Sequence, residues 1–188
     1  MRHFNRYDHL AREGDRREKV LRLEEGWAAR YRLVAGGARQ ITSLFLPGDL
    51  CEPQWMLTGA SQLPVIALTP IRAVEIPLKT IHVPPGDGVR RLLVDMVEML
   101  DRQIELIVSL GRKSAKDRIR DFLFELYFRL SRAGYASDSL CPIPITQQDI
   151  GDLLGLSAVH VNRVLGQLRQ DGAIYSNRPI GTACRMAR

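Results

Sequence analysis

The sequence predicts an α+β protein built from an N-terminal β-roll, a long helix and a C-terminal winged helix-turn-helix. Three observations support this fold class. Glycine and proline separate short strand-like runs over residues 13–85. Apolar residues then take a heptad spacing from Val89 to Leu110, and residues 146–172 have the pattern of two short helices joined by a tight turn. The predicted domain ranges are 1–86, 87–111 and 112–188.

The first domain is expected to be a small sandwich or roll, because its short β-forming runs and turns are evenly spaced. Proline and glycine clusters near residues 47–49 and 84–86 punctuate it. The predicted strands are Val20–Leu23, Trp27–Leu33, Gln40–Phe45, Val65–Leu68 and Ala73–Ile76.

The long helix carries two adjacent apolar stripes. Two stripes on one helix need two partners, so one is expected to pack on the roll and the other on a second copy of the helix. We assign the stripe that contains Leu92 and Leu106 to a parallel dimer, and we call it the first stripe. Gln103 in this stripe is the polar residue expected to set the register. A purely intrachain helix, or the reverse assignment with Leu106 facing the roll, stays open. The predicted dimerisation residues are Leu92, Met96, Met99, Gln103, Leu106 and Leu110. The second stripe is Leu93, Val97, Leu100, Ile104 and Ile107.

Gly111 is expected to interrupt the long helix, and Ser114 to cap a second helix over residues 115–132. The segment Ser109–Ser114 is the predicted hinge. The predicted apolar face of the helix over residues 115–132 comprises Ile119, Phe122, Leu123, Leu126 and Leu130.

Residues 146–172 contain the signals of a helix-turn-helix. Thr146 is a predicted N-cap with Asp149 three residues later, close to a capping box. Gly151 falls where the two helices would cross, so a side chain there would push them apart. Gly155 falls at the turn, where glycine tolerates a positive φ.

The second helix of this motif is expected to start at a Ser157 cap, to end at Gly172 and to enter the major groove of DNA. Residues 173–176 and 182–186 then form a hairpin, or wing, whose tip residue Arg178 meets a phosphate. An ordinary αα-hairpin in a core is the alternative. The buried face is Val161, Val164, Leu165 and Leu168. The predicted DNA-binding residues are Thr146, Gln147, Ser157, Ala158, Val159, His160, Asn162, Arg163 and Arg178.

The formal charge of +6 is concentrated in the C-terminal part. Residues 1–111 hold 15 Lys/Arg and 14 Asp/Glu, a net of +1, whereas residues 112–188 hold 12 and 7, a net of +5. A basic half attracts a polyanion by releasing its counterions, although a basic surface alone indicates no more than a solvated face.

The three cysteines, Cys51, Cys141 and Cys184, are odd in number and widely spaced. They predict neither a disulfide framework nor a thiolate metal site. Because no apolar run reaches the length of a membrane span and the N-terminus is too polar for a signal peptide, we expect a cytoplasmic protein without a membrane partner.

A roll, a long dimer helix and a winged helix-turn-helix in this order resemble the Crp/Fnr family of bacterial transcription regulators, on its alphaproteobacterial, FixK-like side. The most specific matching segments are Glu25–Arg32, Phe45–Cys51, Ser109–Ser114 and Thr146–Arg169. The resemblance implies a roll of the cyclic-nucleotide-binding type and a homodimer that binds a two-fold symmetric promoter site in double-stranded DNA and contacts RNA polymerase. Family members usually have another helix and strand before the position of Glu13, so an incomplete roll or a misplaced start codon is expected.

Ligand binding is where the chain departs from the family. Cyclic-nucleotide binders carry Gly-Glu-Leu and then an Arg-Ser or Arg-Thr pair that holds the cyclic phosphate. Residues 48–50 match the first part, and Asp49 could meet a ribose hydroxyl. The phosphate pair falls at Ser61-Gln62, and no arginine lies between Arg39 and Arg72. We therefore expect little or no cyclic-nucleotide binding.

Two further departures concern the cofactor and the operator. The oxygen-sensing branch has an N-terminal cysteine cluster, and since no cysteine precedes Cys51 we expect no iron–sulfur cluster and no other cofactor. Family members often place a glutamate where this chain has Val159, which could touch a thymine methyl. Arg163 matches the family's guanine-reading arginine, and His160 could reach a phosphate or a base edge.

Two other classes of function were weighed. An enzyme with a cupin-like roll needs clustered metal ligands, but His3, His9, His82 and His160 are not paired, so neither catalytic nor metal-binding residues are predicted. A ligand-sensing or protein-binding roll with a vestigial DNA-binding half is the other alternative. Arg163 and the basic C-terminal half argue against it.

Overall fold

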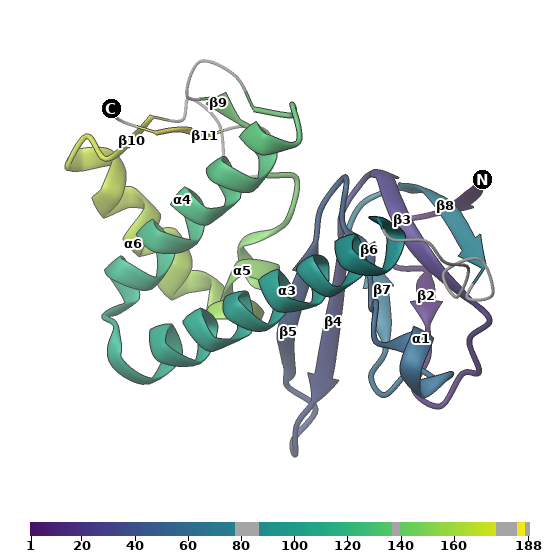
Figure 1. Ribbon diagram of the computed structural model, residues 1–188. Coiled ribbons are helices and arrows are strands. Elements are labelled where there is room, and N and C mark those ends of the chain that lie inside the picture. The colour runs from purple at the N-terminus through teal and green to yellow at the C-terminus, as the bar shows by residue number, and fades with distance from the viewer. Residues whose placement is uncertain (78–86, 137–139, 176–183, 187–188) are drawn as a thin grey trace. The chain divides into compact units, whose positions relative to one another are not determined.

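The computed structural model describes residues 1–77, 87–136, 140–175 and 184–186. The chain divides into two compact units, Met1–Glu105 and Leu106–Arg188, and the division falls inside the long helix α3. The order of elements along the chain is that of the predicted α+β fold, with a roll of strands, two long helices and a C-terminal helix-turn-helix (Figure 1).

The first unit is built on two four-stranded antiparallel sheets, in the orders β1-β8-β3-β6 and β2-β7-β4-β5. Apolar side chains from both sheets form one core around Trp55 of the short helix α1 (Trp55–Thr58). The strands are β1 (Arg2–Phe4), β2 (His9–Ala11), β3 (Lys19–Glu25), β4 (Ala28–Leu33), β5 (Arg39–Phe45), β6 (Leu50–Cys51), β7 (Val65–Ala67) and β8 (Ile71–Pro77).

The five predicted strands are confirmed as β3, β4, β5, β7 and β8, with ends that differ by one or two residues. Strands β3 and β5 each contribute three buried residues, and the rest of each strand is partly or fully exposed. The sequence did not predict β1, β2, β6 or α1, which have only two to four residues each. The three-residue β7 was predicted because it lies in the apolar run Val65–Leu68.

Helix α3 spans Asp87–Arg112, so the expectation that Gly111 interrupts it is wrong. A Cβ at Gly111 would meet nothing within 4 Å. One such glycine costs a helix only about 1 kcal/mol relative to alanine, which a long helix can absorb. The next helix, α4 (Ala115–Arg132), begins as predicted, with the Ser114 hydroxyl accepting a hydrogen bond from the Asp117 amide at 3.2 Å. Its predicted buried face is confirmed.

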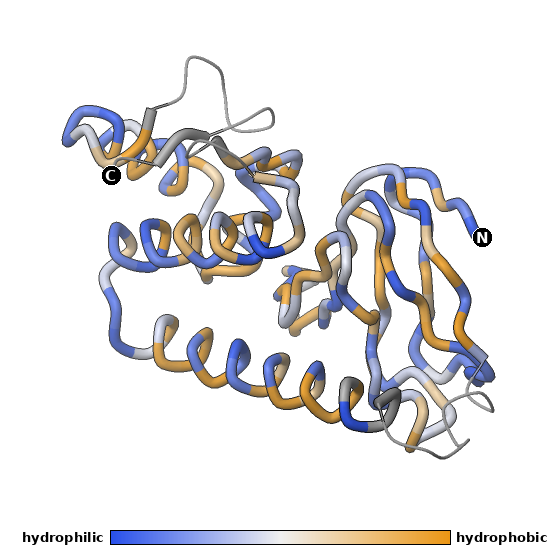
Figure 2. Tube along the Cα trace, turned by 45° about the horizontal axis from the view of Figure 1, so that its top comes forward, coloured by the Kyte–Doolittle hydropathy of each residue, from blue (hydrophilic) through white to orange (hydrophobic). Residues whose placement is uncertain are grey.

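Helix α3 alternates between hydrophobic and hydrophilic residues along its length (Figure 2), and its contacts favour the alternative assignment of the two apolar stripes. Two residues of the first stripe contact the roll of the same chain: Met99 packs against the roll's core, and the Gln103 amide donates to the Ser43 hydroxyl at 3.2 Å. A third residue of this stripe, Leu92, is buried, with 8% of its surface exposed. The second stripe, which was expected to pack on the roll, is exposed: Leu93, Val97, Leu100, Ile104 and Ile107. The spacing could not decide this, because both stripes have it.

The second unit places α4 with α5 (Gln147–Leu154), α6 (Ala158–Gln170) and a three-stranded sheet in the order β10-β11-β9. Strand β10 (Ile174–Tyr175) pairs with β11 (Cys184–Met186), which is the predicted hairpin. Strand β9 (Leu140–Cys141) was not predicted, and it pairs with β11 so that Cys141 lies opposite Cys184.

Candidate DNA-binding site

Helix α5 starts at a complete capping box. The Thr146 hydroxyl accepts from the Asp149 amide at 3.1 Å, and the Asp149 carboxylate accepts from the Thr146 amide at 2.9 Å. Two backbone donors that the first turn leaves unpaired are thereby satisfied. The expected cap is confirmed, and the nearly buried Asp149 makes it a fixed feature of the fold.

The turn between α5 and α6 depends on two glycines. Gly155 ends α5 with a φ of 66°, in the left-handed region that favours glycine. A Cβ at Gly151 would overlap the carbonyl oxygen of Leu156 in the turn. The predicted need for glycine at position 151 is therefore confirmed, although the obstacle is the backbone of the turn rather than the second helix.

Helix α6 is the helix that was predicted to enter the major groove, and we call it the recognition helix. Ser157 caps it by accepting from the His160 amide at 3.2 Å. The helix ends at Gln170, shortly before Gly172 with its φ of 70°. The four residues of its predicted apolar face are buried against the unit: Val161, Val164, Leu165 and Leu168.

The opposite face of α6 turns its N-terminal half outward. Val159 is 81% exposed, and Asn162 and Arg163 are also exposed, while His160 is partly buried. The Arg163 guanidinium makes no hydrogen bond or ion pair with the described residues. An exposed valine beside an exposed guanidinium suits contact with base edges, because the major groove offers thymine methyls and guanine acceptors.

The structure assembles most of the predicted DNA-binding residues around the two helix N-termini. Thr146 and Gln147 start α5, and Ser157, Ala158 and Val159 start α6. The partial positive charge of helix N-termini and their unpaired amides suits phosphate contacts. Arg178, at the predicted tip of the wing, lies outside the described residues.

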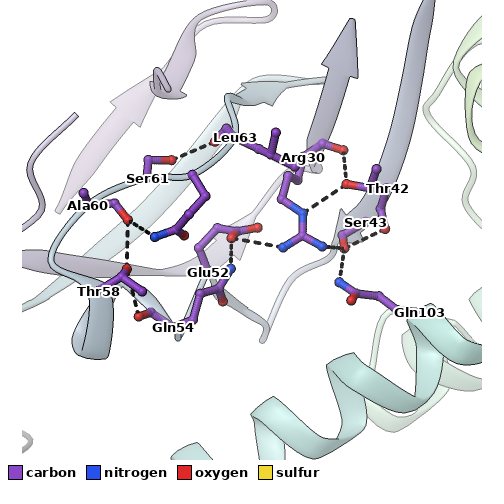
Figure 3. A network of polar contacts seen from close by, with 11 residues as sticks. Arg30, Thr42, Ser43, Glu52, Gln54, Thr58, Ala60, Ser61, Leu63 and Gln103 are labelled. Atoms are coloured by element: carbon purple, nitrogen blue, oxygen red, sulfur yellow. Dashed lines mark hydrogen bonds and ion pairs between the residues drawn. The ribbon is translucent and has the colours of Figure 1, made fainter. Parts of the chain in front are cut away.

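A polar network occupies the interior of the roll (Figure 3). The Arg30 guanidinium of β4 forms an ion pair with Glu52 at 3.2 Å and donates to the Thr42 and Ser43 hydroxyls of β5 at 3.0 Å. Gln103 of α3 shares the Ser43 hydroxyl. Glu52 is 2% exposed and has a left-handed φ of 54°, an uncommon backbone conformation for glutamate.

This network bears on the expected lack of cyclic-nucleotide binding. Arg30 is a largely buried cation of the roll that the sequence did not single out, and its charge is matched by Glu52. Ser61 donates to the Leu63 carbonyl at 2.7 Å, and the Asp49 carboxylate accepts from the Leu46 amide at 2.7 Å, which holds a turn. Whether the roll binds a nucleotide stays a prediction.

Burial raises the pKa of the Glu52 carboxyl above its ordinary value of 4.5, and the charge and hydrogen bond of Arg30 oppose that rise. At pH values between the ordinary and the raised pKa, the Glu52 carboxyl holds more of its proton in the folded state than in the unfolded state. The free energy of unfolding therefore falls as pH rises through that window. Glu52→Gln should remove this pH dependence, so the stability of the variant relative to the wild type should increase as pH rises above 4.5.

Urea unfolding of the roll can be followed through the fluorescence of its buried Trp27 and Trp55, the two tryptophans of the chain. Glu75→Gln is the control, because a hydrogen bond from Lys19 lowers the pKa of Glu75. Its contribution has the opposite sign, with stability lost as pH falls through the lowered pKa. A Glu52→Gln profile parallel to the wild type would contradict the prediction.

Among the described residues, no group of three or more His, Cys, Asp or Glu side chains could hold a metal ion. In that same part of the chain, no helix has the length and apolar character needed to cross a bilayer.

Comparison with known proteins agrees with this geometry. Residues 1–82 match the cyclic nucleotide-binding domain, and residues 117–182 match the Crp-like helix-turn-helix domain. The nitrogen fixation regulation protein FixK of Bradyrhizobium diazoefficiens is 30% identical over 175 residues, which cover 92% of this chain and 73% of that protein. FnrA of Stutzerimonas stutzeri, a transcriptional activator, is 28% identical over 88% of this chain and 68% of its own length.

Solved structures show the same fold. FixK2 of Bradyrhizobium japonicum superposes with a TM-score of 0.85 at 25% identity, covering 100% of this chain and 91% of that one. A CRP-family regulator of Thermus thermophilus shares the fold at a TM-score of 0.75 and 18% identity, covering 100% of this chain and 92% of that one. The protein is therefore a DNA-binding transcription regulator rather than an enzyme, and it belongs to the Crp/Fnr family.

Proposed function

We propose that the protein acts as a homodimer on a palindromic promoter site in double-stranded DNA and contacts RNA polymerase there, in the cytoplasm. The single observation that supports this most is the outward face of α6, where Val159, Asn162 and Arg163 are exposed together beside a capped helix start. Two such helices related by a two-fold axis would enter successive major grooves on one side of the duplex.

The proposed dimer interface is the exposed stripe of α3. Its five residues are between 48% and 69% exposed, which is unusual for a row of large aliphatic side chains on one helix. A second copy of the same helix would remove them from water and repeat the heptad contact along the axis. This replaces the assignment of the dimer to the stripe of Leu92, Met99 and Gln103.

The proposed site residues divide into two roles. Thr146, Gln147 and Ser157 at the helix starts would position the protein through phosphates, as would Arg178 in the wing. Val159 and Arg163 would read bases, with His160, Ala158 and Asn162 flanking them on α6.

Binding to synthetic duplexes tests the function. A palindrome with half-sites about one helical turn apart should bind more tightly than a single half-site. Binding should weaken steeply between about 50 and 200 mM salt, because phosphate neutralisation releases counterions. Equal affinity for every duplex would contradict the proposal and would favour a sensing or protein-binding roll with a vestigial DNA-binding half.

Arg163→Ala is expected to cost roughly 1–3 kcal/mol at the cognate site and to relax the choice of one base pair in each half-site. The reason is that a guanidinium can donate two hydrogen bonds to one guanine. Competition binding against a set of single-base variants measures both effects. Arg163→Lys keeps the charge without the fork, so it should retain general affinity and lose selectivity. Unchanged base preference in Arg163→Ala would make Arg163 a phosphate contact instead.

A further inference from the structure

Arg118 connects the ends of two helices inside the second unit. It lies near the start of α4, and its guanidinium donates to three backbone carbonyls. Nη2 is 2.7 Å from the Leu110 oxygen, Nε is 3.0 Å from the Lys113 oxygen, and Nη1 is 3.1 Å from the Leu154 oxygen. Leu110 lies in the last turn of α3, and Leu154 is the last residue of α5.

The Leu110 and Leu154 carbonyls belong to the group that a helix leaves unpaired. The last four carbonyls of a helix have no partner within it, and the helix dipole gives that end a partial negative charge. Arginine suits such a place because its planar fork carries five donors in fixed directions. One side chain therefore satisfies the C-terminal ends of α3 and α5 together.

The packing beside Arg118 shows that α5 ends directly against the last turn of α3. A Cβ built on Gly155 would lie 3.3 Å from the Leu110 side chain and 3.8 Å from Nη1 of Arg118. The recognition helix α6 follows the end of α5 after three intervening residues, beyond a turn whose geometry Gly151 and Gly155 restrict. A change in the angle between α3 and α5 would therefore move α6.

We propose that Arg118 is a positioning residue that sets which half-site spacing the dimer accepts, by fixing α5 and α6 to the last turn of α3. This rests on the proposed function, in which α3 holds the two subunits together. Arg118 accomplishes this by bonding two carbonyls, of Leu110 and Lys113, in the segment that the sequence predicts as a hinge. Without these bonds the recognition helices would reach a wider range of separations.

The test compares Arg118→Met with Arg120→Met. The first keeps an unbranched aliphatic side chain and removes every donor. The second removes the same charge from the same helix at an exposed arginine that pairs with Asp117 and Asp121. Dissociation constants are measured for three palindromic duplexes: the preferred spacing, one base pair shorter and one base pair longer.

Arg118→Met should lose about tenfold in affinity at the preferred spacing and much less at the other two, which flattens the profile. Arg120→Met should change the affinity for all three duplexes by the same factor, because it removes a positive charge and leaves the contacts of Arg118 with α3 and α5 in place. Arg118→Lys, with one ammonium in place of the fork, should fall between the wild type and Arg118→Met. An equal loss on all three duplexes in Arg118→Met would overturn the proposal.

Hydrogen exchange on the full-length protein tests the contacts of Arg118 with α3 and α5 in the absence of DNA. In Arg118→Met, amides near Gly155 and in the last turn of α3 should exchange faster, while those in the middle of α6 should not change. Unchanged exchange near Gly155, or a uniform increase over the whole unit, would overturn the proposal. If Arg118→Met does not fold, Arg118→Lys takes its place in both experiments. Equal binding of the wild type to all duplexes would instead contradict the proposed function, and exchange would still decide the role of Arg118.

Discussion

Ile104→Asp is expected to convert the dimer into monomers and to abolish binding to the palindromic duplex. Ile104 lies in the middle of the exposed stripe of α3 and is 48% exposed in the single chain. In a two-fold dimer the substitution would place two facing carboxylates in an apolar interface, and desolvated like charges cost several kcal/mol. Each monomer would then present one recognition helix and half of the contacts. Light scattering at about micromolar concentration and a gel-shift assay measure the two effects.

Two variants serve as controls. Arg102→Gln changes the net charge by the same amount on α3, at a partly buried side chain that pairs with Glu98, and should leave the dimer intact. Leu106→Asp belongs to the stripe first assigned to the dimer and should lower the melting temperature of the chain instead. Dissociation by Leu106→Asp together with an intact Ile104→Asp dimer would restore the original assignment.

The parts of the fold that the sequence predicts are those whose signals are local. The helix-turn-helix could be predicted because Thr146, Gly151, Gly155 and Ser157 each act on backbone within about five residues. The predicted strands lie in runs of β-forming residues between glycines and prolines, whereas β1 and β6, with three and two residues, do not stand out in this way. Of the C-terminal sheet, only the β10–β11 hairpin was predicted, because β9 joins it from a distant part of the chain.

The remaining missed features depend on contacts between residues far apart in the sequence. A heptad spacing shows that α3 needs two partners, but only the Ser43 hydroxyl and the roll's core reveal which stripe faces the roll. Glu52 has no sequence signal of burial, because its pairing with Arg30 requires the roll to be folded. Arg118 likewise resembles any helical arginine until Leu154 is brought beside Leu110.

Gly151→Ala is expected to destabilise the second unit and to abolish specific DNA binding. The new methyl group would overlap the Leu156 carbonyl oxygen, which belongs to the backbone of the turn and cannot rotate away as a side chain would. Relief requires α5 and α6 to separate, at a cost of roughly 1–3 kcal/mol for such overpacking. Because α6 would move with the turn, its outward face would no longer fit the groove. Thermal unfolding followed by circular dichroism, together with binding to the palindrome, measures both effects.

Gly166→Ala is the matched control within the same motif. Gly166 lies inside α6, and a Cβ there would meet nothing within 4 Å. Both substitutions replace a helical glycine, so both gain the same helix propensity, about 1 kcal/mol. The difference between the two variants therefore isolates the overlap with Leu156. Gly166→Ala should raise the melting temperature and keep DNA binding, whereas Gly151→Ala should lower it. If both variants were stabilised equally, the turn would be able to yield, and glycine at position 151 would not be what fixes α6 in its reading position.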